Sequence, residues 1–73
     1  MKYKPNDILT YKHTGLTMYV KILFVYENNF IGMLLETSNK LAINLPYKFN
    51  YDPSFRLSTE KEINELNKRM VFQ

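Results

Sequence analysis

The sequence predicts a mainly β fold, which we expect to be a small barrel or a strongly bent antiparallel meander of four to five strands with one short C-terminal helix. Residues 17–37 are rich in β-branched and aromatic side chains, which favour strands. Residues 59–70 instead repeat apolar side chains with a helical period. A chain of 73 residues makes one domain at most. We therefore expect the β part over about 4–58 and the helix over about 60–70.

The composition excludes several kinds of site. The chain has no cysteine and one histidine, His13, so neither a disulfide nor a thiolate or multi-histidine metal centre can form. Two glycines in all are too few for a glycine-rich loop that binds phosphate through its backbone. No base, nucleophile and orienting group occur together in a recognisable spacing. We therefore expect a protein that is not an enzyme and that uses no metal and no cofactor.

The longest β-rich stretch predicts a hairpin. Asn28-Asn29 interrupts it, and asparagine tolerates the positive φ that a two-residue hairpin turn requires. A turn at this point places Phe24 opposite Met33 and Lys21 opposite Glu36. The register thus yields an apolar pair and an oppositely charged pair, each of which stabilises a sheet by about 0.2–1 kcal/mol.

Alternation along this hairpin predicts which side chains form the core. The opposite face is not cleanly polar, because Leu23 would face Leu34 there, so we expect either partial cover on both faces or an exposed apolar patch. The predicted core side chains are Met18, Val20, Ile22, Phe24 and Tyr26.

Two further strands are predicted around the hairpin. The first covers residues 7–12, DILTYK, and ends at the HTG sequence of 13–15. After a three-residue loop at 38–40, another strand covers 41–45 and ends at Pro46, which cannot donate a ladder hydrogen bond. The side chains expected to face inward from this strand are Leu41, Ile43 and Leu45.

The C-terminal segment carries the local signals of a helix. Thr59 can cap the N-terminus, and Glu62 can complete a capping box three residues later. Glutamates lie early and basic residues late, as the helix dipole prefers. We expect the helix to pack over an open end of the sheet. Its predicted apolar face consists of Ile63, Leu66 and Met70.

Three short motifs resemble those of small SH3-like barrels, including KOW-type modules. KPNDILTYK at 4–12 is similar to their first strand, GLTMYVKIL at 15–23 to their second, and DPSFRL at 52–57 to the turn into their last. Asn6 stands where many such barrels have glycine, and asparagine also tolerates positive φ. The resemblance covers roughly residues 4–58 and implies a barrel, with nucleic-acid binding as one function of its KOW-type members.

The charge distribution supports that nucleic-acid alternative. The net charge is +3, and the first 21 residues account for it, because they hold four lysines against Asp7. A basic patch attracts phosphate, although an ordinary solvated surface has the same composition. The residues predicted to contact nucleic acid are Lys2, Lys4, Lys12, His13, Lys21 and Lys48.

The aromatic segment PYKFNYDPSF at 46–55 has two interpretations. If it is extended, Tyr47, Phe49 and Tyr51 share one side, and Lys48 points to the other. The rings can complete a core that so short a chain builds with difficulty, or one or two tyrosines can remain exposed as a contact surface. For the second interpretation, the predicted partner-binding residues are Tyr47, Lys48, Tyr51, Tyr19, Leu23 and Leu34.

Together these features predict a small binding or regulatory protein that occupies a surface of a larger cellular protein as an inhibitor or adaptor. Nucleic-acid binding and self-association are the alternatives. Amino acids encoded by AT-rich codons dominate the chain, which suggests a phage or a low-GC bacterium. The N-terminal residues show no apolar signal-like stretch, and no run has the roughly 20 apolar residues of a membrane span. We expect a cytoplasmic protein, in the host cytoplasm if a phage encodes it.

Overall fold

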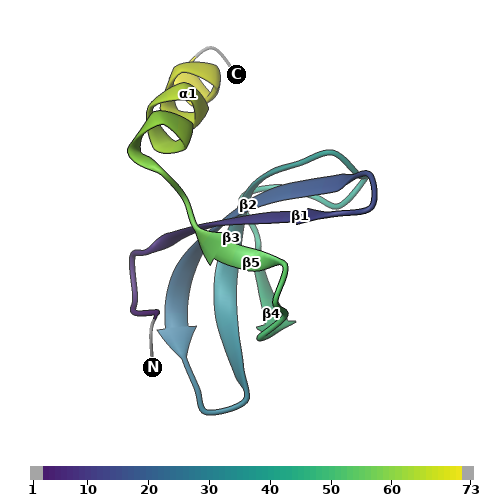
Figure 1. Ribbon diagram of the computed structural model, residues 1–73, viewed down its shortest axis with the longest axis vertical. Helices are drawn as coiled ribbons and strands as arrows, with labels where there is room; N and C mark the ends of the chain where they lie inside the picture. The colour runs from purple at the N-terminus through teal and green to yellow at the C-terminus, as the bar shows by residue number, and fades with distance from the viewer. Residues whose placement is uncertain (1–2, 72–73) are drawn as a thin grey trace.

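A computed structural model describes residues 3–71 as five antiparallel strands in one sheet and one C-terminal helix (Figure 1). The strand order is β4-β3-β2-β1-β5, so β4 and β5 form the two edges. The elements are β1 (Ile8–His13), β2 (Leu16–Val25), β3 (Asn29–Thr37), β4 (Pro46–Asn50), β5 (Phe55–Leu57) and α1 (Glu60–Val71). The predicted mainly β fold with a short C-terminal helix is therefore confirmed.

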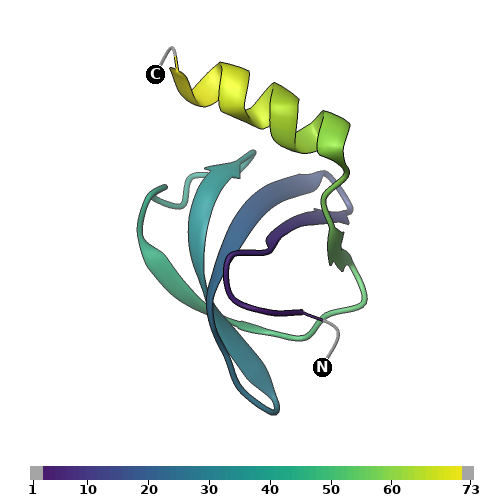
Figure 2. The ribbon, with the colours of Figure 1, turned by 90° about the vertical axis from the view of Figure 1, so that its left-hand side faces the viewer.

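The sheet curls strongly but does not close into a barrel (Figure 2). Edge strand β4 pairs only with β3, and the three-residue β5 pairs only with β1. The two edges meet through side chains, since the ring centroids of Phe49 and Phe55 are 5.6 Å apart. Of the two predicted architectures, the strongly bent meander describes this sheet, which is not closed into a barrel. Aromatic rings rather than backbone hydrogen bonds span the opening.

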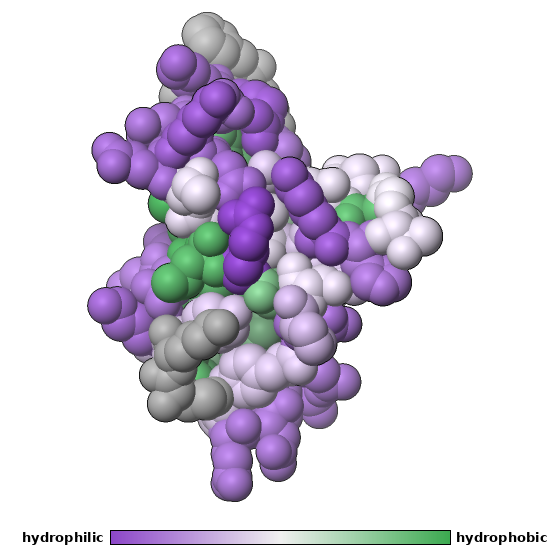
Figure 3. All heavy atoms as spheres, viewed as in Figure 1, coloured by the Kyte–Doolittle hydropathy of each residue, from purple (hydrophilic) through white to green (hydrophobic). Residues whose placement is uncertain are grey.

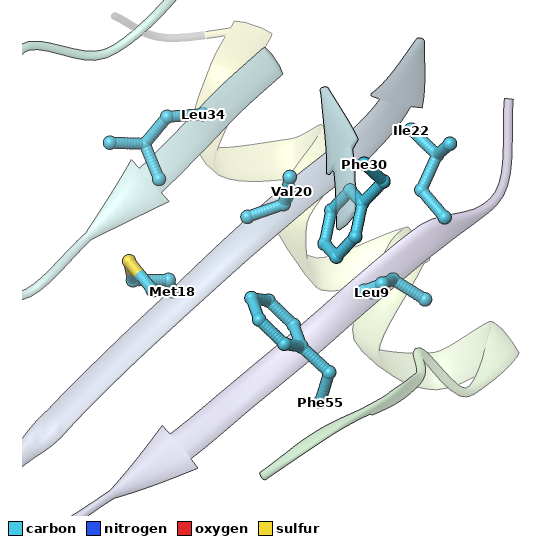
Figure 4. Close-up of a cluster of buried hydrophobic side chains, with 7 residues drawn as sticks. All are labelled: Leu9, Met18, Val20, Ile22, Phe30, Leu34 and Phe55. Carbon is cyan, nitrogen blue, oxygen red and sulfur yellow. The ribbon is translucent and has the colours of Figure 1, made fainter. Parts of the chain in front are cut away.

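The hydrophobic core fills the concave side of the sheet. Phe30 lies at its centre and is fully buried, with the ring centroids of Phe49, Tyr51 and Phe55 at 5.4, 5.5 and 5.2 Å. Figure 4 shows the buried cluster on one side of the strands while α1 passes behind them. The cluster consists of Leu9, Met18, Val20, Ile22, Phe30, Leu34 and Phe55.

The β2–β3 hairpin forms as predicted, but its turn lies one residue earlier. The backbone N–H of Tyr26 donates to the carbonyl of Asn29 at 2.9 Å, so the two loop residues are Glu27 and Asn28. Neither Asn28 nor Asn29 has positive φ. The predicted Asn28-Asn29 turn, and the register based on it, are therefore wrong.

Irregularities move the register further along the hairpin. Ile22 pairs with Gly32 and Phe24 with Ile31, which leaves Leu23 as an extra residue in a β-bulge. The bulge changes the side-chain alternation, so Phe24 lies outside the core with 58% of its surface exposed. Met18, Val20 and Ile22 are core residues as predicted, whereas Phe24 and the 52% exposed Tyr26 are not.

The predicted pairing of Lys21 with Glu36 is wrong, because the earlier turn and the Leu23 bulge together place Lys21 opposite Met33. A second bulge, at Leu35, follows the pair of Val20 and Leu34 and places Glu36 opposite Tyr19.

The fourth strand starts where the prediction ended it. Residues 41–45 belong to a loop, with Leu41, Ile43 and Leu45 exposed by 45, 36 and 49%. Pro46 begins β4 and lies opposite Met33. This pairing places Phe49 opposite Phe30, and their rings stack.

Two tight turns use left-handed backbone conformations. Asn6, with φ 75°, accommodates the turn before β1, as its tolerance of positive φ predicted. Thr14 and Gly15 have φ 36° and 78° between β1 and β2, which is the pattern of a type I′ hairpin turn.

The helix begins with the predicted capping box. The backbone N–H of Glu62 donates to the Thr59 hydroxyl at 3.1 Å, and the N–H of Thr59 donates to the Glu62 carboxylate at 2.9 Å. Figures 1 and 2 show α1 crossing one end of the sheet, with the β2–β3 hairpin extending away from it. Within residues 3–71, no helix is long and apolar enough to cross a membrane.

Candidate functional site

The aromatic segment around β4 serves mainly as the border of the core. Tyr47, Phe49 and Tyr51 are half-buried and pack against the core cluster. The hydroxyls of the two tyrosines donate to the carbonyls of Ala42 at 2.8 Å and Tyr26 at 2.7 Å. Loss of hydration raises the pKa of Tyr51 above its ordinary value. These contacts favour the first of the two interpretations, in which the rings complete the core.

A shallow pocket of about 260 Å³ remains where the sheet fails to close. Its charged side chains are one lysine and one aspartate, so it has no net attraction for an anion. Within the described residues, no three His, Asp or Glu side chains gather where they could hold a metal ion. The pocket is lined by Tyr11, Leu16, Met18, Lys48, Phe49, Asn50, Asp52 and Phe55.

The face of the sheet opposite the core, which we call the outer face, is covered by α1 at one end. Successive strand pairings align Arg56, Thr10, Tyr19 and Glu36 in one row across four strands. Thr10 in this row is buried, and its hydroxyl lies 2.7 Å from that of Ser58.

Two ion pairs fix α1 above that row. Arg56 contacts both carboxylate oxygens of Glu62 at 2.7 and 2.8 Å. Arg69 contacts those of Glu36 at 2.8 and 2.9 Å and lies 5.7 Å from the ring centroid of Tyr19. The hydrogen bonds from Arg56, together with those from Thr59, lower the pKa of Glu62 to about 2 despite its partial burial.

Beyond α1, the next two rows of the outer face are uncovered, and we call these two rows the open face. Figure 3 shows an apolar patch below α1, whereas the side chains on the outside of α1 itself are hydrophilic. The aromatic side chains Phe24 and Tyr26 project at this end of the sheet, 58 and 52% exposed. The first row consists of Ile8, Lys21, Met33 and Pro46, and the second of Phe24, Ile31 and Lys48.

The open face combines apolar side chains with positive charge. Ile8, Ile31 and Met33 are half-buried, so each still presents apolar surface to solvent. Lys21 and Lys48 are the charged residues of the two rows. Such a surface can bind an apolar group with a negatively charged border.

The structure brings only some of the predicted partner-binding residues to this face. Lys48 is exposed on it, and the half-buried Leu23 forms its bulge. Leu34 is fully buried opposite Val20, so the expected Leu23–Leu34 patch is wrong. Tyr19 lies beneath Arg69.

The predicted nucleic-acid residues do not form one patch. Lys4 lies in the turn before β1, whereas Lys12 and the exposed His13 lie at the far end of that strand. Lys21 and Lys48 share the open face. Lys2 is outside the described residues.

Sequence reasoning missed Phe24, Ile31 and Met33 as surface residues. The uninterrupted apolar run ILFVY at 22–26 was a usable signal, because alternation sends part of any such run to the opposite face. Comparison of the chain with protein-family models, curated proteins and solved structures gives no match.

Proposed function

We propose that this chain is a non-catalytic binding protein that occupies a surface of a larger protein through its open face. The observation that carries this is the exposure of Phe24, an aromatic side chain with 58% of its surface in solvent, beside the half-buried apolar side chains of Ile8, Ile31 and Met33. Large exposed aromatic side chains within apolar patches are typical of interface hot spots.

The surrounding residues support a protein partner. Ile31 lies opposite Phe24, and Ile8 and Met33 belong to the neighbouring row. The two rows also hold Lys21 and Lys48. Interfaces generally place apolar and aromatic residues at the centre and charges around them. The amino-acid composition suggests a phage or a low-GC bacterium as the source, and the role proposed for the protein in such a cell is that of an inhibitor or adaptor.

The test compares two sets of exposed apolar residues. The immobilised protein is expected to retain a specific protein from a lysate of its source cells, and Phe24→Ser with Tyr26→Ser to abolish that retention without lowering Tm. The matched control is Leu41→Ser with Leu45→Ser, which removes similarly exposed side chains from the loop and should leave retention intact. Equal retention by both double variants contradicts the assignment of the open face.

Single-stranded nucleic acid is the second candidate, because Phe24 and Tyr26 could stack on bases while Lys21 and Lys48 neutralise phosphates. Two phosphate contacts predict an affinity loss of about sevenfold between 50 and 200 mM salt. Fluorescence anisotropy with a 20-nucleotide single strand measures this. Binding that is absent or independent of salt rejects this candidate.

A further inference from the structure

We propose that the open face binds an acidic amphipathic helix of the partner protein, which lies across the strands beside α1. This inference depends on the protein-binding function proposed above. It specifies the secondary structure and the charge of the segment that is bound.

The chain's own helix shows how the outer face holds a helix. Glu62, Leu66 and Arg69 follow the i, i+4, i+7 spacing of one helix face. The buried Leu66 lies between two residues that pair with Arg56 on β5 and Glu36 on β3. Seven residues of helix advance about 10 Å, and long side chains at each end extend this across three strand spacings of about 4.8 Å each. A helix is therefore the right size to reach across this face.

The uncovered rows leave room for a second helix. Packed helix axes are about 8–10 Å apart, which corresponds to about three residues along a strand. Three residues along β2 from Tyr19, which lies under α1, is Ile22. That position falls between the row of Lys21 and the row of Phe24. A helix beside α1 would therefore cover both rows of the open face.

The charges specify what this second helix must carry. The row beneath α1 has one Arg and one Glu, and α1 supplies one Glu and one Arg in return. The two open rows have Lys21 and Lys48 and no acidic residue. If opposite charges pair here as they do beneath α1, the bound helix carries acidic side chains beside the two lysines. Its apolar stripe covers Phe24 and Ile31.

Charge also disfavours a second copy of this chain as the occupant. Face-to-face stacking of two open faces would bring four lysines together without a compensating acid. If the open face instead packed against the solvent side of another copy's α1, its lysines would lie near Lys61 and Lys68 as well as near glutamates. Lys61 and Lys68 are exposed there. An acidic partner segment avoids both conflicts.

The test places a photo-crosslinking phenylalanine derivative at position 24, with the same group at the exposed Lys61 of α1 as the matched control. Cross-linking is carried out in source-cell lysate, and mass spectrometry locates the partner residues that react at position 24. We expect them to recur three and four residues apart in a segment of net negative charge. We also expect Lys21→Glu with Lys48→Glu to weaken binding to the purified partner at least tenfold. Acidic-to-lysine changes in that partner segment should restore binding to the charge-reversed variant.

Several results would overturn the inference while leaving the proposed function in place. These are cross-links to a partner segment with strand-like alternation, and charge reversal of a correctly folded variant that leaves affinity unchanged. If circular dichroism shows that the charge-reversed variant unfolds, Lys21→Gln with Lys48→Gln takes its place, and an unchanged affinity again overturns the inference. Cross-links confined to nucleic acid or to another copy of this chain overturn both the inference and the proposed function, as does the absence of cross-linked protein specific to position 24.

Discussion

The covered and open halves of the outer face belong to the same strands but meet solvent differently. Beneath α1, Arg56 and Glu36 each contact an oppositely charged residue at 2.7–2.9 Å, and Leu66 is fully buried. On the open half, Phe24 is 58% exposed, and Lys21 lies opposite Met33 with no acidic neighbour in its row. The ionic groups of the first half pair within the protein, whereas the second half presents apolar groups and lysines that have no ion-pair partner among residues 3–71.

The largest expected effect is a difference in the free energy of unfolding between substitutions on the two halves. Leu66→Ala removes a fully buried side chain from under α1 and should lower the free energy of unfolding by about 2–4 kcal/mol. Phe24→Ala on the open half should change it by less than about 1 kcal/mol, because most of that ring is already in water. Urea unfolding measures both variants. Equal losses would mean that the open half is as important to stability as the covered half.

Gly32→Ala tests the close packing between the central strands that both halves share. A Cβ at this position would overlap the Val20 side chain and lie 3.3 Å from the Phe30 ring. We expect a loss of about 1–3 kcal/mol from overpacking, measured by thermal unfolding. Gly15→Ala is the control, since only its φ of 78° opposes the change and no atom obstructs it. A neutral Gly32→Ala would contradict the packing described for the core.

The Arg56–Glu62 pair makes the attachment of α1 dependent on pH. The folded-state pKa of Glu62 is lowered from 4.5 to about 2, so its stabilisation is present above about pH 4.5 and is lost as the pH falls towards 2. Glu62→Gln should therefore cost about 1 kcal/mol at pH 7, a figure that allows for solvent screening of Arg56. The difference between variant and wild type should vanish near pH 2. A difference that stays constant from pH 7 to pH 2 would assign the effect to packing and not to charge.

The smallest expected effect belongs to the open half. Lys21→Gln and Lys48→Gln should each change the free energy of unfolding by less than about 0.5 kcal/mol, because neither lysine forms an ion pair among the described residues. Chemical denaturation of the two variants measures this. A loss above 1 kcal/mol for either would show that the lysine supports the fold, and would remove it from the proposed binding surface.

Sequence patterns predicted those features that depend on neighbouring residues. The Thr59–Glu62 capping box and the helix that follows it depend on contacts three residues apart. The positive φ of Asn6 likewise follows from the type of residue and its turn. The core positions Met18, Val20 and Ile22 follow from the alternation of one uninterrupted strand segment.

Features that depend on competition between distant segments were not predictable in the same way. An extra residue at Leu23 or Leu35 shifts every pair beyond it, and no local pattern specifies where such a bulge occurs. The fourth strand covers 46–50 and not 41–45, and there Phe49 stacks on Phe30, a contact between segments that are distant in the sequence. The open face was not predicted because its residues depend on two such features. The Leu23 bulge turns Phe24 outward, and the position of α1 decides which rows stay uncovered.

The edge strand β4 has a consequence for the behaviour of the protein at high concentration. Exposed edges of sheets invite pairing with other chains, and proline or lysine on the edge discourages it. Pro46 begins β4, and the exposed Lys48 lies at its middle. Intermolecular strand pairing is therefore obstructed beside the apolar side chains of the open face. Replacing Lys48 with a β-branched residue would be expected to promote fibrils or amorphous aggregates before it weakened the native fold.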